Sequence, residues 1–543
     1  MDDPTQAVVI TEPNMDFNEL FLLFALSLIP LCFLILRPKK SKGTAPMVPG
    51  AWPVVGHLPM YRSVKPQAHV AFGAMADVYG PAFMTKIGSR NALVISSEEV
   101  AREVYTVHDK FLRRQDMIAG EILGYDGLLP LVSPQGAYWR EIRKIVISQL
   151  MSASVVDTLK GRRAGEVDVA FRDLYVRWEQ HNGRPHQKGV LVDMKPEFIN
   201  VATNMTVMMV AGKRYYGNSP NCEAGEARRI GKLILEAVQN FGRYSISDFI
   251  PYLGWLEWKE KKIMKRMAQE LDCVFESWIE EHKNKRGESE KDYLDMVLES
   301  IEQHKILGSS DAHKTAKAVC LNMAISGSDA VVAILVWAVS LLVNNQHVLR
   351  KAQEELDRTI GNQRVVEESD LKDLVYLQAI VKETFRLYPP APFVAYRETT
   401  EDFVIANGNF HIPAGTHVMV NEWKVQRDPT IWPNPEEFEP ERFLTSHKEV
   451  DVGGKMNHKL FPFGLGRRAC PASLLGTKMV QYILARFLHS FDVANPSNQN
   501  VDMTEDNNLV NLKATPLEVF ITPRLHESLY LVDSNSENFS NKA

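Results

Sequence analysis

One short loop constrains this chain more than any other feature: FPFGLGRRACPAS, at residues 461–473, which runs into a helical pattern. Gly464 and Gly466 allow the backbone of this cysteine loop to approach another group closely. Cys470 stands just before the predicted helix, where the helix dipole favours a negative charge. The loop therefore presents a sulfur atom at a position that suits a thiolate.

The charges beside this cysteine point in the same direction. Arg467 and Arg468 place positive charge close to Cys470, and such charge lowers the pKa of a thiol. The thiolate is the form that acts as a nucleophile or binds a metal. On composition alone, a Gly-Pro turn with an uninvolved cysteine explains the segment equally well.

Spacing separates these two interpretations. Four residues hold the positions of the haem-thiolate signature F-x-x-G-x-R-x-C-x-G: Phe463, Gly466, Arg468 and Cys470. The sequence thereby resembles the cytochrome P450 superfamily, and within it the microsomal plant enzymes of specialised metabolism such as the CYP82 family. The resemblance implies that Cys470 is the fifth ligand of the iron of haem b and that Phe463 packs near its sulfur. Gly464 and Gly466 would then belong to the haem-binding loop.

Further motifs of the same family occur in the expected order. Trp139 and Arg143, in YWREIR, resemble the residues that hold a haem propionate, and Arg397, in VAYRETT, lies where another propionate ligand is expected. With Arg468, these arginines would neutralise two buried carboxylates, and Trp139 would add an indole donor.

Glu383 and Arg386, in KETFRLYPP, lie three residues apart on one face of a predicted helix. Taken alone they would be an exposed pair that stabilises the helix by about 0.2–0.5 kcal/mol. The resemblance instead identifies them with the family's E-x-x-R motif. Arg442, in PERF, would complete a charged cluster that supports the haem loop, and buried charges need such pairing.

The segment AISGSDAVVAILVW, at residues 324–337, is predicted to be a buried apolar helix that carries one carboxylate, Asp329. By itself Asp329 would be interpreted as a helix cap. The resemblance implies that this is the distal helix above the iron. Gly327 would open the helix where O2 binds, and Asp329 would belong to the path that delivers protons.

The sequence departs from the family pattern (A/G)-G-x-D-T-(T/S), because Ala330 and Val331 replace the two hydroxyl residues. Waters, Ser328 or a substrate hydroxyl would have to carry the protons. Three outcomes stay open: hydroxylation through a substituted relay, poor hydroxylation with leakage of peroxide, or an atypical reaction such as coupling, desaturation, ring closure or rearrangement. A non-catalytic haem-binding protein is a more remote alternative. Ala472 also replaces the last glycine of the signature and adds one methyl group beside the loop.

The N-terminus is predicted to be a membrane anchor. Residues 20–36 form an uncharged apolar run at the short end of the length that spans a bilayer. Acidic residues precede the run and basic residues follow it, which is the reverse of a cleaved signal peptide. The positive-inside rule then keeps the remainder cytosolic. We therefore expect a single-pass protein of the endoplasmic reticulum membrane, with a short lumenal segment at 1–19 and a basic, proline-rich linker at 37–62.

Residues 63–527 are predicted to form one catalytic domain, mainly α-helical with small β-sheets, which is the cytochrome P450 fold. The strand-like segments are short: 82–88, 92–97, 404–413, 416–421 and 517–523. Residues 528–543 are polar and are predicted to be a disordered tail.

Composition excludes two other classes. The net charge is −5 and there is no basic stripe interleaved with aromatic residues, so a nucleic-acid partner is not expected. The five cysteines are odd in number and form no C-x-x-C pair, which excludes a disulfide framework or zinc site. Apart from Cys470, they are predicted to be small buried hydrophobic residues: Cys32, Cys222, Cys273 and Cys320.

The resemblance also implies the partners. Electrons would come from NADPH-cytochrome P450 reductase, so that NADPH is used indirectly and O2 is the co-substrate. Arg467, Lys455 and Lys459 would steer an acidic partner, or would be ordinary solvated charges. The segments that contact substrate in the family are mainly apolar here and favour a small apolar substrate, such as a terpenoid or hydrophobic alkaloid. They are residues 117–132, 325–335, 389–396 and 507–512.

Overall fold

The computed structural model describes these parts of the chain: 43–61, 66–182, 189–216, 224–241, 245–284, 291–304, 312–453, 458–497, 499–506 and 510–531. Residues Ala45–Ala543 form one compact unit, and Met1–Thr44 form a separate one. The predicted anchor at 20–36 lies outside the described residues, as do Lys455, Cys32 and Cys222. The anchor and the domain boundaries therefore stay predictions.

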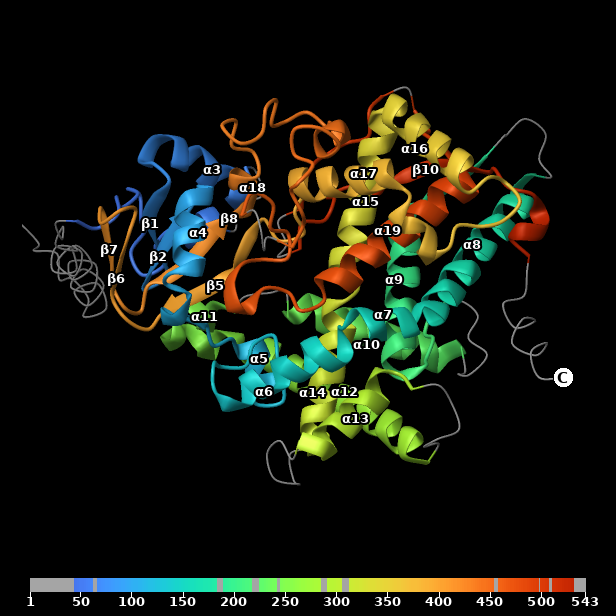
Figure 1. The fold of residues 1–543 in the computed structure, drawn as a ribbon. Helices are drawn as coiled ribbons and strands as arrows, with labels where there is room; N and C mark the ends of the chain where they lie inside the picture. Colours follow the sequence, from blue (N-terminus) through green and yellow to red (C-terminus); the bar gives the residue numbers. More distant parts are fainter. Residues whose placement is uncertain are drawn as a thin grey trace, which may run out of the picture. The chain divides into compact units, whose positions relative to one another are not determined.

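Helices make up most of the described chain (Figure 1). The α-helices are α2 (Leu58–Tyr61), α3 (Ala68–Tyr79), α4 (Glu98–Thr106), α5 (Ile118–Ile122), α6 (Ala137–Ile145), α7 (Ala153–Thr158), α8 (Lys160–Asn182), α9 (Met194–Ala211), α10 (Ala224–Phe241), α11 (Ile246–Phe249), α12 (Trp258–Asn284), α13 (Tyr293–His304), α14 (Ala312–Ser326), α15 (Asp329–Asn344), α16 (Gln346–Thr359), α17 (Val375–Leu387), α18 (Glu422–Val425) and α19 (Ser473–Ser490).

The strands are short and form three small sheets. They are β1 (Ala82–Ile87), β2 (Arg90–Ile95), β3 (Leu112–Arg114), β4 (Val190–Asp193), β5 (Phe393–Thr399), β6 (Phe403–Ile405), β7 (Phe410–Ile412), β8 (His417–Asn421), β9 (Phe491–Ala494) and β10 (Glu518–Pro523). The largest sheet has the order β1-β2-β8-β5-β3, and only its β2–β8 pair is parallel. The other sheets are β4-β10-β9 and the β6–β7 hairpin. The prediction of a mainly α-helical fold with small sheets is confirmed.

The five predicted strand segments are all found, the β6–β7 hairpin with Asn407 and Gly408 at positive φ in its turn. Four strands, β3, β4, β5 and β9, have no distinct sequence signal. Two of them pair with segments far along the chain: β3 with β5, and β4 with β10. Partners that are distant in sequence create these strands, so local pattern does not reveal them.

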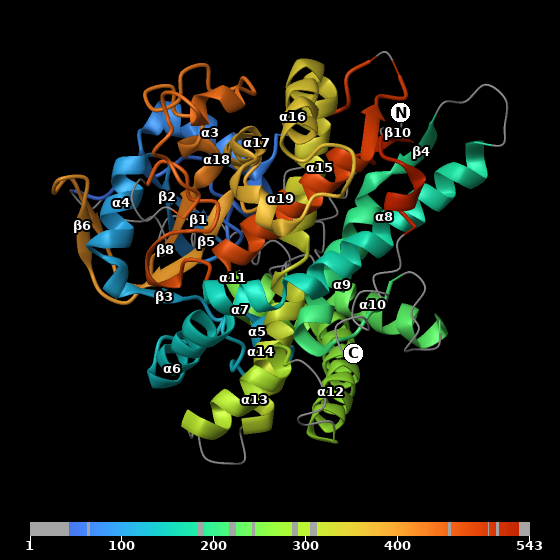
Figure 2. The same cartoon turned by 45° about the vertical axis from the view of Figure 1, so that its right-hand side comes forward.

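The molecule has a sheet side and a helical side (Figure 1). The large sheet, α3 and α4 make up one side of the molecule. The long helices α8, α9, α16 and α19 make up the other side. The helices α14 and α15 follow one another through the helical part, where α15 packs against α9, α17 and α19 (Figure 2). Among the described residues, only Ala312–Asn344 is long and apolar enough to cross a membrane, and most of it is buried. This stretch comprises α14 and α15, the two central core helices of the domain.

Two sequence predictions need comment. Cys320 is buried as expected, but Cys273 is exposed, because it lies on the polar face of the amphipathic helix α12. Tyr530 is buried and stacks on Tyr175, with ring centroids 4.5 Å apart. Packing against the domain thus continues three residues beyond the predicted end at 527.

Candidate active site

Three charged side chains are buried together where α17 meets the segment after α18. Glu383 and Arg386 have fully buried side chains, and that of Arg442 is 3% exposed. Arg386 makes two 2.8 Å hydrogen bonds to the carboxylate of Glu383, and Nε of Arg442 donates to the same carboxylate at 3.0 Å. The pair is thus not an exposed one. Breaking a buried pair typically costs about 3–5 kcal/mol, because one charge is left without a partner.

This cluster also holds the backbone that leads to the cysteine loop. Arg386 donates to main-chain carbonyl groups of three residues: Gln426, Pro435 and Glu437. Arg442 donates to the carbonyl oxygen of Pro433 at 2.9 Å. The guanidinium groups therefore satisfy carbonyl groups of a segment that has little secondary structure of its own.

The cysteine loop is built on backbone conformations that favour glycine. Gly464 and Gly466 have φ values of 75° and 71°. A β-carbon on Gly466 would lie 2.6 Å from the carboxylate of Asp109, so this position also needs the space that glycine leaves. The N–H of Cys470 donates to the carbonyl oxygen of Phe463 at 2.8 Å and closes the loop.

The prediction that Arg467 and Arg468 lower the pKa of the Cys470 thiol is wrong. Arg467 turns away from the sulfur and binds Asp109, with Nε 2.5 Å from its carboxylate. Burial raises the pKa of the Cys470 thiol, and the N–H of Ala472 and the charge of Arg143 oppose this only in part. The side chain of Cys470 is exposed to the cavity, so the sulfur becomes a stable thiolate when a cationic group such as a metal ion binds it there.

Arginines gather beside the cysteine loop around the indole of Trp139. The guanidinium of Arg468 lies 4.4 Å from the centre of that ring, and the guanidinium of Arg143 lies 5.5 Å from it. Burial, with the charges of Arg397 and Arg143, lowers the pKa of Arg468 to about 9. Nη1 of Arg397 and Nε of Arg468 are buried without an acceptor in the part of the chain that the structure describes. This concentration of buried positive charge fits an anionic ligand such as the two propionates of haem.

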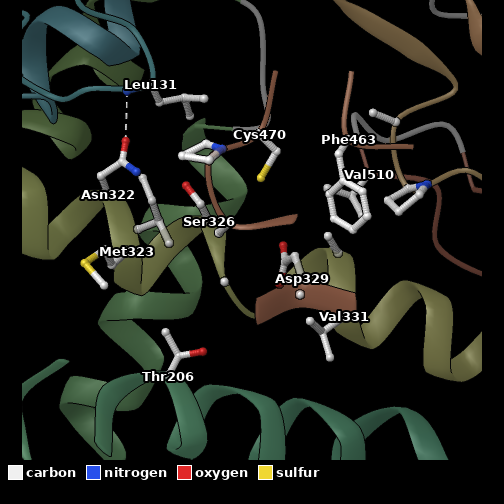
Figure 3. A pocket seen from close by; sticks show the side chains of 18 of the residues that line it. Leu131, Thr206, Asn322, Met323, Ser326, Asp329, Val331, Phe463, Cys470 and Val510 are labelled. Carbon is white, nitrogen blue, oxygen red and sulfur yellow. Dashed lines mark hydrogen bonds between the residues drawn. The ribbon is translucent and has the colours of Figure 1, made fainter. Parts of the chain in front are cut away.

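A cavity of about 830 Å³ lies between this loop and the central helices. Such a volume falls in the range of small-molecule sites. Cys470 and Phe463 lie on one side of it, and Ser326 and Asp329 face them from the break between α14 and α15 (Figure 3). Trp139 and Arg143 of α6 also line the cavity. The structure therefore brings the predicted haem-binding residues other than Gly466, and the predicted distal-helix residues other than Ser328, into one site.

The two central helices are separated at Gly327 and Ser328. A β-carbon on Gly327 would lie 3.0 Å from the methyl group of Thr206, which belongs to α9. Gly327 thus allows α9 to approach the break closely. Ser328 is the N-cap residue of α15, and Asp329 is the first residue inside it, so Asp329 is not the cap.

The carboxylate of Asp329 lines the cavity, and burial raises its pKa to about 6, whereas the charge of Lys195 acts weakly in the opposite direction. Among the residues that the structure describes, no side chain forms a hydrogen bond or ion pair with it. A carboxyl group with this pKa exchanges protons readily near neutral pH.

The structure identifies a different serine from the one singled out in the sequence. Ser328 is 4% exposed and does not line the cavity, whereas Ser326 is open to it. Ala330 and Val331 line the cavity without a hydroxyl group. Ser326 occupies the position where the family pattern has Ala or Gly, and that departure is the signal that could have revealed it.

Parts of all four predicted substrate segments line the cavity, for example Leu131, Val332, Pro390 and Val510. Residues 507–509 lie outside the described residues. Other lining residues come from helices that the sequence did not connect to the site: Ile199, Thr206 and Met209 of α9, and Leu235, Gln239, Asn240 and Phe241 of α10.

Comparisons with known proteins agree with this geometry. The sequence model of the family "Cytochrome P450" matches residues 46–520. Strychnine-10-hydroxylase of Strychnos nux-vomica is 41% identical over 95% of this chain and 100% of its own. Xanthotoxin 5-hydroxylase CYP82C2 of Arabidopsis thaliana is 42% identical over 91% of this chain and 95% of its own. Flavonoid-6-hydroxylase of Mentha piperita is 40% identical over 95% of this chain and 100% of its own.

A solved structure shares the fold. A zebra fish cytochrome P450 with progesterone aligns with a TM-score of 0.68 and 24% identity, over 84% of this chain and 99% of that chain.

Proposed function

The chain belongs to the cytochrome P450 family, whose cofactor is haem, and from that premise we propose that it is a membrane-anchored monooxygenase of plant specialised metabolism. It inserts one oxygen atom of O2 into an apolar, ring-containing substrate. The observation that carries the proposal is the cavity, in which Cys470 faces Ser326 and Asp329 (Figure 3).

Each group of residues has a defined task in this proposal. When bound, the haem supplies the activation of O2, and a thiolate ligand donates electron density to its iron. Cys470 is that ligand. Arg143, Arg397 and Arg468 neutralise the propionates, and Trp139 supports them. This assignment accounts for the buried arginine nitrogens that have no acceptor in the described chain.

Protons reach the cavity through the break between α14 and α15. Asp329 can take up and release a proton at its carboxyl group near neutral pH, because burial raises its pKa to about 6. Ser326 presents a hydroxyl group on the cavity wall, where Oγ can accept one hydrogen bond and donate another. It replaces the hydroxyl groups that Ala330 and Val331 lack.

An atypical oxidation is the second candidate function. Ala330 and Val331 line the cavity with methyl groups where the family pattern has hydroxyl groups. A coupling, desaturation or rearrangement places less demand on proton delivery. The names of the relatives favour the first candidate, since those compared above are hydroxylases.

The proposed substrate is a compact ring system. The relatives act on strychnine, xanthotoxin and a flavonoid, according to their names. The lining of this cavity is largely aliphatic and aromatic, as in Val331, Val332 and Phe463. The lining fits any apolar ring system, and the names of the relatives favour a hydrophobic alkaloid or aromatic metabolite over a terpenoid.

Membrane association is supported by one surface segment. Large apolar side chains are exposed close together along the chain: Tyr252, Trp255, Leu256, Trp258 and Ile263. Four lysines share this stretch: Lys259, Lys261, Lys262 and Lys265. Aromatic residues mixed with lysines are typical of a surface that meets lipid headgroups. This observation is independent of the predicted anchor at 20–36.

The electron donor in this proposal is a membrane-bound NADPH-cytochrome P450 reductase. Lys459 is exposed and is available to an acidic partner. Arg467 is less available to such a partner, since Asp109 already binds its guanidinium.

The test is the mass of the product. Membranes that contain this chain and a reductase are supplied with strychnine, xanthotoxin and a simple flavone, each with NADPH. A gain of one oxygen atom supports oxygen insertion, whereas loss of two hydrogens or unchanged mass supports the second candidate. Cys470→Ala should abolish both the product and the thiolate-type carbon monoxide spectrum, and Cys273→Ala, at an exposed cysteine, should change neither.

A further inference from the structure

Asn322, on α14, is a polar side chain on the cavity wall that the proposed chemistry does not use. Its Oδ1 accepts a hydrogen bond from the N–H of Leu131 at 2.9 Å (Figure 3). Leu131 belongs to the loop before α6 and lies 191 residues away in the chain. The hydrogen bond therefore joins the central helix to a loop that also lines the cavity.

This hydrogen bond determines which way the amide of Asn322 faces. A backbone N–H can only donate, so the oxygen of the amide must face Leu131 and the nitrogen must face the other way. In Figure 3 the oxygen points to Leu131, and the nitrogen lies on the side of Ser326. Nδ2 has no acceptor among the residues that the structure describes. An amide nitrogen whose orientation is already determined is a preorganised donor.

The loop on the other side of this contact is held as well. Nε of Arg114 donates to the carbonyl oxygen of Leu131 at 3.1 Å. A little further on, Arg468 donates to the carbonyl oxygen of Ser133. Both backbone polar groups of Leu131 are thus engaged, and the loop does not compete for Nδ2 of Asn322.

The surroundings of Asn322 are mostly apolar. Val319 and Met323 are its neighbours on α14, and Ser326 follows one turn later on the same face. Ligand sites typically combine an apolar lining with a few polar groups that fix orientation. An unused donor in such a wall favours a ligand that carries an acceptor at the matching position.

We infer that Asn322 determines substrate specificity by donating a hydrogen bond from Nδ2 to a carbonyl or ether oxygen on the ring system of the substrate. This inference rests on the proposed function, because it treats the cavity as the substrate site. It narrows the substrate from any apolar ring system to one with a hydrogen-bond acceptor at its edge. Asn322 is a binding residue and takes no part in the oxidation.

Two pairs of tricyclic compounds test this. Dibenzosuberone and dibenzosuberane differ only by a carbonyl group against a methylene group, and so do fluorenone and fluorene; neither methylene compound carries an oxygen atom. Binding to the full-length, haem-loaded chain in lipid nanodiscs is measured by equilibrium dialysis. We expect each ketone to bind about fivefold more tightly than its methylene partner, which is the effect of one ordinary hydrogen bond.

The matched variant is Asn322→Asp, which keeps the oxygen that accepts from Leu131 and replaces the nitrogen donor with an acceptor. It should lose the preference for ketones while binding the methylene compounds within about twofold of the wild-type affinity. Asn322→Leu should lose the preference and also weaken both members of each pair, because the loop contact is lost too.

Equal binding of ketone and methylene compounds by the wild type would overturn the inference. A preference for ketones that survives in Asn322→Asp would also overturn it, since the side chain of Asn322 would then only hold the loop at Leu131. Dialysis measures binding without turnover. A chain that prefers ketones but forms no oxygenated product would therefore contradict the proposed oxidation and leave the role of Asn322 standing.

Discussion

Thr206 of α9 lies so close to Gly327 that a β-carbon on the glycine would be 3.0 Å from its methyl group and 3.1 Å from its hydroxyl oxygen. This contact sets how closely α9 packs on the break between α14 and α15. The hydroxyl group of Thr206 donates to the carbonyl oxygen of Ala202 in its own helix. It is therefore already engaged, and Ser326 stays the better candidate for the proton relay.

The contact predicts the effect of Gly327→Ala. The new methyl group overpacks the interface, so we expect the free energy of unfolding to fall by about 1–3 kcal/mol. Combining it with Thr206→Ala, which removes two of the three close atoms and leaves the carbonyl oxygen of Met323 at 3.1 Å, should recover part of the loss. The measurement is denaturant unfolding of the purified chain. Equal losses with and without Thr206→Ala would show that another contact is responsible.

The raised pKa of Asp329 predicts that the stability of the folded chain depends on pH. Burial raises its pKa from 3.8 to about 6, so the folded chain favours the protonated form. The stability that this group contributes is fully present below pH 3.8 and is lost as the pH rises through about 6. Asp329→Asn resembles the protonated form. Its unfolding free energy should therefore fall less than that of the wild type between these two pH values.

Denaturant titrations at several pH values measure this difference, and comparing the two proteins cancels the contribution of other carboxyl groups. Parallel pH curves for wild type and variant would contradict the raised pKa. Asp329→Asn should also lower the rate of product formation by about 100-fold, the scale of general acid catalysis.

The hydroxyl group of Ser326 is expected to determine how much product is formed per NADPH consumed. Ser326→Ala removes the only hydroxyl group that the segment from Ser326 to Val332 presents to the cavity. We expect product per NADPH to fall about tenfold, with a matching rise in released peroxide. Ala330→Thr should partly restore the ratio in that variant, because it returns a hydroxyl group one turn away. If Ser326→Ala leaves the ratio unchanged, protons reach the cavity by another route.

The buried cluster predicts the largest structural effect. Glu383→Ala leaves Arg386 and Arg442 without their carboxylate, and we expect a loss of about 3–5 kcal/mol together with poor retention of haem. Arg266→Ala is the matched control, since it breaks the exposed pair with Glu270 on α12 and should cost no more than about 0.5 kcal/mol. Thermal unfolding and the yield of haem-loaded protein measure both. Similar losses in the two variants would mean that burial is not the source of the effect.

Sequence reasoning succeeded where the signal is local. The glycines and the cysteine of residues 461–473, the Glu383–Arg386 pair and the acidic residue in an apolar helix are each visible within about ten residues of chain. Their spacing carries the information, because loop closure and helix periodicity depend on neighbouring residues. The family, the main fold class and the identity of these motifs could therefore be predicted.

Sequence reasoning failed where the answer depends on burial. Arg467 adjoins the cysteine loop in sequence but binds Asp109, so its charge does not reach the thiol. The pKa of Cys470 is instead raised by desolvation at its position in the protein interior. Cys273 was assigned by residue type, yet it lies on an exposed helix face. Desolvation is a property of the surroundings, and no short stretch of sequence encodes it.

The sequence by itself determined that this chain is a helical haem-thiolate protein with an altered distal helix, since those features rest on residue types at set spacings along the chain. Only the tertiary structure decided that Ser326 rather than Ser328 lines the cavity, that Thr206 packs on Gly327, and that Asn322 holds Leu131 from across the site. The physical reason is that hydrogen bonds and close packing act over a few ångströms, and folding brings together groups that lie more than a hundred residues apart.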